Sequence, residues 1–180
     1  MKLTINFLFA FCLIANHYPV FAEQDPRTDE IEDYRALLNV LHKYTMSVET
    51  ADLESMIPLF HAQAMTYGTL MGQQVIASPK PYFDFVRNRP KPQEVGEKLL
   101  ATITNVRIDG NIASAQVQFA NHWCTSGTNH LGLIRDAGNW KIIAMMFWVR
   151  PAPVTIEHSK YPEGYCTPSS IAAAITSKDK

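Results

Sequence analysis

The first half of the chain carries apolar residues at helical spacing. Across Asp29–Val48 they recur every three or four positions, which predicts one long helix with a single apolar face. Residues 53–60 predict a short second helix, and Ser78–Val86 predicts a third that ends at Pro90. Between the second and third helices, Ala64–Tyr67 predicts a short strand. The N-terminal part is therefore expected to be mainly helical.

From Lys98 onward the hydrophobic pattern has a period of two. Alternating apolar and polar residues predict strands, and Asp109-Gly110-Asn111 is typical of a tight hairpin between two of them. We read Thr125–Asn129 as a connection. Helices followed by an antiparallel meander indicate an α+β domain rather than repeated βαβ units. The predicted strands are Leu99–Ile108, Ile112–Trp123, His130–Arg135 and Trp140–Val149.

The N-terminal 22 residues are typical of a secretory signal. Lys2 precedes an apolar run, Ile5–Ala15, and Val20-Phe21-Ala22 offers a cleavage site after Ala22. The run is short for a permanent membrane span, although an uncleaved anchor is the alternative. We therefore divide the chain into a signal peptide (1–22), one domain (23–150) and an irregular tail (151–180), and expect a periplasmic or extracellular protein.

Composition and charge narrow the choice of function. The 180 residues are 47% hydrophobic and 18% charged, which fits one packed domain, and the formal net charge is −1. Without a basic excess, nucleic-acid binding is not expected. Outside the signal two cysteines remain, Cys124 and Cys166. In an exported protein this pair predicts a disulfide, with two unpaired thiols as the alternative.

Several local motifs together point to a known superfamily. They are Tyr44, Glu49–Leu53, Leu59-Phe60-His61, Gly68, Gly72, Asp109–Ala115, Asn129–Ile134 and Gly138–Ile143. With the order of elements, they resemble the nuclear transport factor 2-like superfamily, whose members include ketosteroid-isomerase-like and polyketide-cyclase-like proteins. The nearest resemblance is to its SnoaL-like or "putative lumazine-binding" branch, over residues 29–149.

The resemblance implies an architecture but no single chemistry. It implies a cone-shaped barrel, with about three N-terminal helices packed on a strongly curved antiparallel sheet and an open mouth. It also implies homodimers formed through the outer face of the sheet. Because this fold hosts enzymes, binding modules and proteins of unknown role, function has to be argued from the residues inside the cone.

A cone lined by apolar side chains can hold a small apolar or aromatic ligand, with a few polar groups that fix its orientation. Tyr44 is a hydrogen-bond donor for a carbonyl group or, alternatively, a core aromatic. His61 is an acid or base near neutral pH or, alternatively, a hydrogen-bonded residue at a helix end. The candidate ligand-binding residues are Tyr44, His61, Tyr67, Phe83, His122 and Trp148.

His122, Cys124 and His130 together raise the question of a metal site. Two imidazoles and a thiol lie close in the sequence, but no fourth ligand is evident and the spacing fits no ordinary zinc pattern. His122 and His130 could instead lie on the outer face of the sheet, at a dimer contact. We therefore predict neither a metal nor a cofactor.

Three functions remain open from the sequence, and a small-molecule-binding module is the one we favour. The alternative is an isomerase-, cyclase- or dehydratase-like enzyme that uses His61 and Tyr44 as its catalytic pair. The acidic base of isomerase-like members has no counterpart here, since the sheet positions read Ala, Gln or Asn, as at Gln118 and Asn121. A third possibility is an interaction protein whose sheet binds a partner.

Overall fold

The computed structural model describes residues 26–152. The predicted signal peptide, Cys166 and nearly all of the predicted tail lie outside the described residues. The helices are α1 (Pro26–Thr50), α2 (Leu53–Met56) and α3 (Lys80–Arg87), with 3-10 turns η1 (Ile57–Leu59) and η2 (Pro92–Val95). The strands are β1 (Phe60–Leu70), β2 (Gln73–Ala77), β3 (Leu100–Asp109), β4 (Ile112–His122), β5 (Thr125–Asp136) and β6 (Asn139–Pro151).

The predicted helices are present, and the second is shorter than expected. α1 buries Leu37, Leu41, Tyr44 and Val48, which lie on the face that the helical spacing predicted. Asp52 caps α2 by accepting a hydrogen bond from the Ser55 backbone N–H at 3.2 Å. The α-helix gives way to a 3-10 turn at the next residues because the Pro58 ring lacks the N–H that an α-helix needs.

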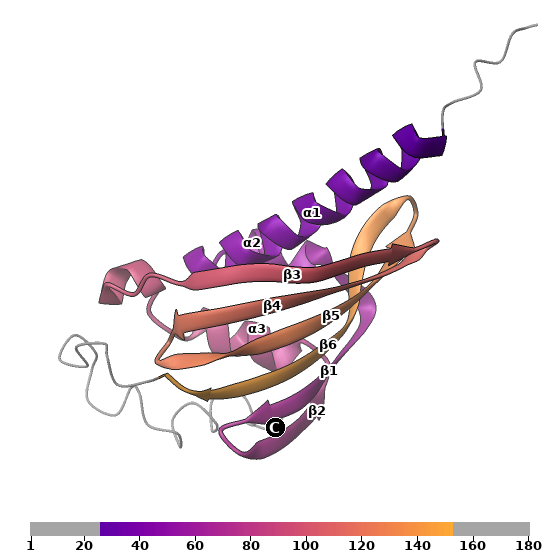
Figure 1. The fold of residues 1–180 in the computed structure, drawn as a ribbon. Coiled ribbons are helices and arrows are strands. Elements are labelled where there is room, and N and C mark those ends of the chain that lie inside the picture. The colour runs from indigo at the N-terminus through magenta and orange to yellow at the C-terminus, as the bar shows by residue number, and fades with distance from the viewer. Residues whose placement is uncertain (1–25, 153–180) are drawn as a thin grey trace, which may run out of the picture.

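The α+β class is confirmed, but two details of the predicted sheet are wrong. The six strands lie in the order β2-β1-β6-β5-β4-β3, and β1 runs parallel to β6, so the sheet is mixed rather than antiparallel. A long crossover through α3 and the first three strands of the meander brings β6 back beside β1 in the same direction. The sheet is also neither closed nor strongly curled, since β2 and β3 form two separate edges (Figure 1).

Two strand boundaries also differ from the prediction. β1 spans Phe60–Leu70 rather than the short predicted strand, because it pairs with β2 on one side and β6 on the other. The predicted connection Thr125–Asn129 is the first part of β5. A two-residue turn at Trp123 and Cys124 lets His122 pair directly with Thr125, and this turn contains none of the Gly or Asn residues that usually reveal such a hairpin.

The core lies between the helices and one face of the sheet. α1 and α3 both lie on this inner face (Figure 1), where they meet inward-pointing residues such as Val117, Leu131 and Met145. A second cluster forms where α3 meets the β4–β5 turn, with Phe85 against Trp123. No helix within residues 26–152 combines the length and apolar character that crossing a membrane requires.

Candidate ligand pocket

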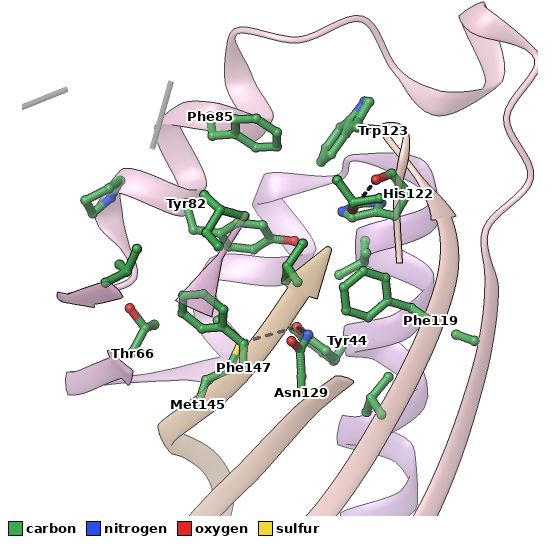
Figure 2. A pocket seen from close by; sticks show the side chains of 18 of the residues that line it. Tyr44, Thr66, Tyr82, Phe85, Phe119, His122, Trp123, Asn129, Met145 and Phe147 are labelled. Carbon is green, nitrogen blue, oxygen red and sulfur yellow. Dashed lines mark hydrogen bonds between the residues drawn. The ribbon is translucent and has the colours of Figure 1, made fainter. Parts of the chain in front are cut away.

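An apolar pocket lies between α1, α3 and the inner face of the sheet. It contains about 870 Å³ of empty space, counting its opening to solvent. Figure 2 shows aromatic side chains on several sides of this space. Among the described residues that line it there is no Asp, Glu, Lys or Arg. The aromatic part of the lining comes from Tyr44, Tyr82, Phe85, Phe119, His122, Trp123 and Phe147.

One polar group in the pocket is the hydroxyl of Tyr44, on the inner face of α1. It accepts a hydrogen bond from Asn129 Nδ2 at 2.9 Å and lies 3.5 Å from Met145 Sδ, to which it donates. Asn129 points inward because it lies in register between Val117 of β4 and Phe147 of β6. Burial raises the pKa of Tyr44, while the Asn129 bond lowers it by less. Tyr44 is therefore a neutral phenol at physiological pH.

Tyr82 enters the same space from α3. Figure 2 shows its ring directed into the pocket, opposite the wall that carries His122. Burial raises the pKa of Tyr82 well above its ordinary value, and the neighbouring Tyr44 raises it further. Two neutral phenols, Tyr44 from α1 and Tyr82 from α3, therefore line the same pocket.

His122, at the end of β4, supplies an imidazole. Its side chain is 7% exposed, and neither ring nitrogen has a hydrogen-bond partner within residues 26–152. The ring lies tilted against Trp123, with centroids 4.3 Å apart, and edge-on to Phe119 at 5.8 Å. Burial, with a smaller contribution from the charge of Arg89, lowers the pKa of His122 to about 3. The imidazole is therefore uncharged near neutral pH.

A bulge explains why His122 faces the pocket. Along β4, Val117 and Phe119 point inward, so strict alternation would place Asn121 inward and His122 outward. The register with β5 shifts between Phe119 and His122, and Asn121 has a φ of 58°. One extra residue in a strand exchanges the faces of the residues that follow, and bulges are frequent next to functional sites.

The turn after His122 is held by a buried carboxylate. Trp123 and Cys124 both have positive φ, 45° and 63°, and the carboxylate of Glu97 accepts hydrogen bonds from both of their backbone N–H groups, at 2.7 and 2.8 Å. The indole Nε1 of Trp123 donates to the Pro90 carbonyl at 3.0 Å. Glu97 is itself 7% exposed. The segment before β3 thus anchors the turn.

Comparison with known proteins identifies the family. The family model described as "Putative lumazine-binding" matches residues 32–148. The chain belongs to this family. The earlier resemblance to the nuclear transport factor 2-like superfamily is thereby confirmed for the branch and, through the solved structures below, for the fold. No curated protein matches the chain.

Solved structures similar to this member of the family share its fold. An NTF2-like protein of unknown function from Shewanella baltica OS155 is 25% identical, with a TM-score of 0.59, over 68% of this chain and 97% of that one. Another, from Methylobacillus flagellatus KT, is 24% identical, with a TM-score of 0.59, over 67% and 94%. A "Putative Scytalone Dehydratase" from Novosphingobium aromaticivorans DSM 12444 is 12% identical, with a TM-score of 0.52, over 72% and 98%.

The structure brings two of the predicted site residues into the pocket, Tyr44 and His122. Phe83 packs in the core against Phe60, with ring centroids 5.3 Å apart. Tyr67 and Trp148 lie on the opposite face of the sheet and are 41% and 53% exposed. These three do not belong to the pocket lining, so a ligand-binding role for them stays a prediction.

His61 lies at the start of β1 and is also absent from the pocket lining. Its Nδ1 accepts a hydrogen bond from the Gln63 backbone N–H at 3.1 Å, and its Nε2 lies 3.9 Å from a carboxylate oxygen of Asp136. The catalytic pair of His61 and Tyr44 is therefore not assembled in this pocket, and a catalytic role for either residue stays a prediction.

The metal and disulfide hypotheses have different outcomes. Within residues 26–152 no three His, Cys, Asp or Glu side chains gather in a way that could hold a metal ion. His130 is exposed whereas His122 and Cys124 are buried. A bond between Cys124 and Cys166 stays a prediction, because Cys166 is outside the described residues.

Several residues that form or support the pocket are not evident from the sequence, for identifiable reasons. Asn129 was placed in a connection, although its position in the register of β5 makes it the partner of Tyr44. Tyr82 was recognised only as part of an apolar helix. Glu97 precedes β3 with no local pattern that reveals its role. Its role becomes clear only from Trp123 and Cys124, the two positive-φ residues whose N–H groups it binds. These lie far along the chain, so the spacing of residues in the sequence does not reveal the contact.

Proposed function

We propose that this protein binds an uncharged, largely apolar small molecule in the pocket between α1, α3 and the sheet. The observation that carries the proposal is the composition of the lining: many aromatic and aliphatic side chains, a few neutral polar groups, and no charged side chain among the described residues. Pockets of this kind bind ligands mainly by burying apolar surface, and the few polar groups orient the ligand.

The neutral lining also selects against charged ligands. A carboxylate or ammonium group that loses its water in such a pocket would find no opposite charge there, which is costly. The family description, "putative lumazine-binding", supports a small-molecule ligand of the ring type. We further propose that the protein acts outside the cytoplasm, on the basis of the signal-like residues 1–22.

The proposal is tested by calorimetric titration at pH 7 with ring compounds that differ in charge. 2-Methoxynaphthalene is neutral and 2-naphthoate carries a carboxylate. We expect the neutral compound to bind at least about tenfold more tightly, since burying the unpaired carboxylate costs more than the 1.4 kcal/mol that corresponds to tenfold. Failure of the neutral compound to bind, or tighter binding of naphthoate, would contradict the proposal.

A pair of variants locates the binding. Ala101 lines the pocket from β3 and is exposed, so Ala101→Trp should narrow the opening without disturbing the core. Thr102 is the next residue, also exposed, and it does not belong to the lining. Ala101→Trp should weaken binding of 2-methoxynaphthalene, and Thr102→Trp should not. Equal affinities in the two variants would place the ligand elsewhere.

A further inference from the structure

His122 lies within a strained segment of backbone. Asn121, Trp123 and Cys124 have φ values of 58°, 45° and 63°, in the left-handed region that residues with side chains rarely adopt. Such strain persists only where the surrounding structure fixes it, and it concentrates at functional sites. Left-handed residues on both sides of His122 indicate that the position of its side chain is maintained at a cost in backbone strain energy.

Glu97 is the residue that maintains it. Its buried carboxylate holds the two turn N–H groups at 2.7 and 2.8 Å, and Phe85 packs edge-on against Trp123 with centroids 5.2 Å apart. A hairpin turn of this kind usually contains Asn-Gly, which would need no such support. Burying the carboxyl group of Glu97 is costly. The two hydrogen bonds that it accepts offset this cost and fix the geometry of the turn.

The imidazole is placed among rings with its polar atoms unused. Both nitrogens of His122 are buried, and within the described residues neither is reached by a donor or acceptor. Buried polar groups in proteins are nearly always hydrogen-bonded, so this exception calls for an explanation. A neutral imidazole offers one N–H donor and one acceptor nitrogen. A ligand hydroxyl that donates to the acceptor nitrogen would satisfy that nitrogen.

We propose that the ligand is an uncharged ring compound that carries a hydroxyl group, that His122 hydrogen-bonds this hydroxyl, and that Glu97 is the positioning residue for His122. The inference rests on the proposed function and adds the polar group of the ligand. Phe119 and Trp123 beside the imidazole favour a flat ring next to the hydroxyl. Because protein atoms cover both nitrogens, binding includes a small rotation of the imidazole toward the ligand.

The test compares 2-naphthol with 2-methoxynaphthalene, which has the same rings but cannot donate a hydrogen bond. Calorimetry at pH 7 gives the ratio of their affinities for the wild-type protein, for His122→Phe and for His130→Gln, a control on the exposed surface of β5. We expect His122→Phe to reduce the preference for naphthol over methoxynaphthalene about tenfold, which is the typical effect of one hydrogen bond in a buried site. His130→Gln should leave this preference unchanged.

Glu97→Gln tests the positioning role. It replaces one acceptor oxygen by an amide that cannot accept, so one turn N–H loses its partner. We expect the preference for naphthol to fall several-fold while the affinity for methoxynaphthalene stays within about twofold, because the turn relaxes but the apolar walls remain. The exposed Glu54→Gln is the control. Equal losses for both compounds would mean that Glu97 has no specific role toward His122.

Nuclear magnetic resonance of the wild-type protein with ¹⁵N-labelled histidine gives a readout that needs no variant. Addition of 2-naphthol should shift the ring nitrogens of His122 in the manner of a new hydrogen bond, and methoxynaphthalene should not. If both compounds bind with a ratio that His122→Phe leaves unchanged, and the nitrogen signals do not respond, the inference fails and the pocket function stands. If neither compound binds, both are overturned.

Discussion

Burial keeps the titratable side chains of the pocket uncharged. Tyr44 and Tyr82 have pKa values raised by burial, and that of His122 is lowered to about 3 by the same cause. The direction differs because a phenol is charged when deprotonated and an imidazole when protonated. All three groups are therefore hydrogen-bonding rather than ionic groups at neutral pH, and this favours recognition of a neutral ligand.

The depressed pKa of His122 predicts an acid-sensitive fold. Between pH 6.5 and about 3 the unfolded chain binds a proton at this residue and the folded chain does not, so stability is lost as the pH falls through this window. The loss from pH 7 to pH 4 is on the order of 3 kcal/mol for this group. Urea unfolding at a series of pH values should show a flatter dependence for His122→Phe than for the wild type.

The matched control for this titration is His42→Gln, which removes an exposed histidine of α1 that lies outside the pocket lining and outside the sheet. It should follow the wild-type dependence on pH. The carboxylates whose pKa values are lowered, such as Asp52 and Asp84, contribute equally in all three proteins. A His122→Phe profile that runs parallel to the wild-type profile would mean that this imidazole is not buried in its neutral form.

Among the elements, β4 supplies the imidazole of the pocket, because His122 lies at its end. The alternating apolar residues from Ala113 to Phe119 lie on its inward face, and the bulge at Asn121 then changes the face that His122 occupies. A period-two pattern has no marker for an inserted residue, so the sequence could not predict that His122 points inward. It also could not predict the turn at Trp123, because its backbone conformation depends on Glu97, far away in the chain.

The bulge yields a prediction with an internal control. Asn121 has a φ of 58°, which glycine adopts freely and a β-branched residue does not. Asn121→Val should destabilise the protein by about 1–2 kcal/mol and weaken binding of 2-naphthol, because the bulge must shift or remain strained. Asn121→Gly should cost less than half of that. Urea unfolding gives the stabilities, and equal costs in the two variants would refute a role for the left-handed conformation.

For the whole molecule, most of the order of elements was predictable, but the strand β2 (Gln73–Ala77) and the shape of the sheet were not. The long helix, the third helix and the meander were visible in the spacing of apolar residues. That β6 pairs in parallel with β1, however, depends on contacts between Met65–Leu70 and Ala144–Val149, which lie far apart in the sequence. The predicted cone failed for the same reason, since closure depends on whether the edge strands meet.

The outer face of the sheet supports the dimer that the superfamily resemblance implied. Four large apolar side chains are exposed there or on the adjoining edge strand: Tyr67, Ile76, Met146 and Trp148. Tyr67 pairs across the sheet with Ile76 on one side and Met146 on the other, which makes a continuous patch. We predict a homodimer through this patch, in which Met146→Glu shifts the protein to monomer in analytical ultracentrifugation.

The matched control for the dimer is Ile112→Glu, which replaces an exposed apolar residue at the start of β4, outside this patch. It should leave the sedimentation coefficient unchanged. A wild-type protein that sediments as a monomer at every concentration would contradict the prediction.

We propose that the space beneath the sheet receives a neutral ring compound. A crystal structure with 6-bromo-2-naphthol tests it most directly, since the anomalous signal of bromine marks the ligand. We predict a bromine peak inside the pocket among Tyr44, Phe119 and Met145, with the naphthol hydroxyl within hydrogen-bond distance of His122. A bromine peak only on the outer surface, with side chains filling the pocket, would contradict the account.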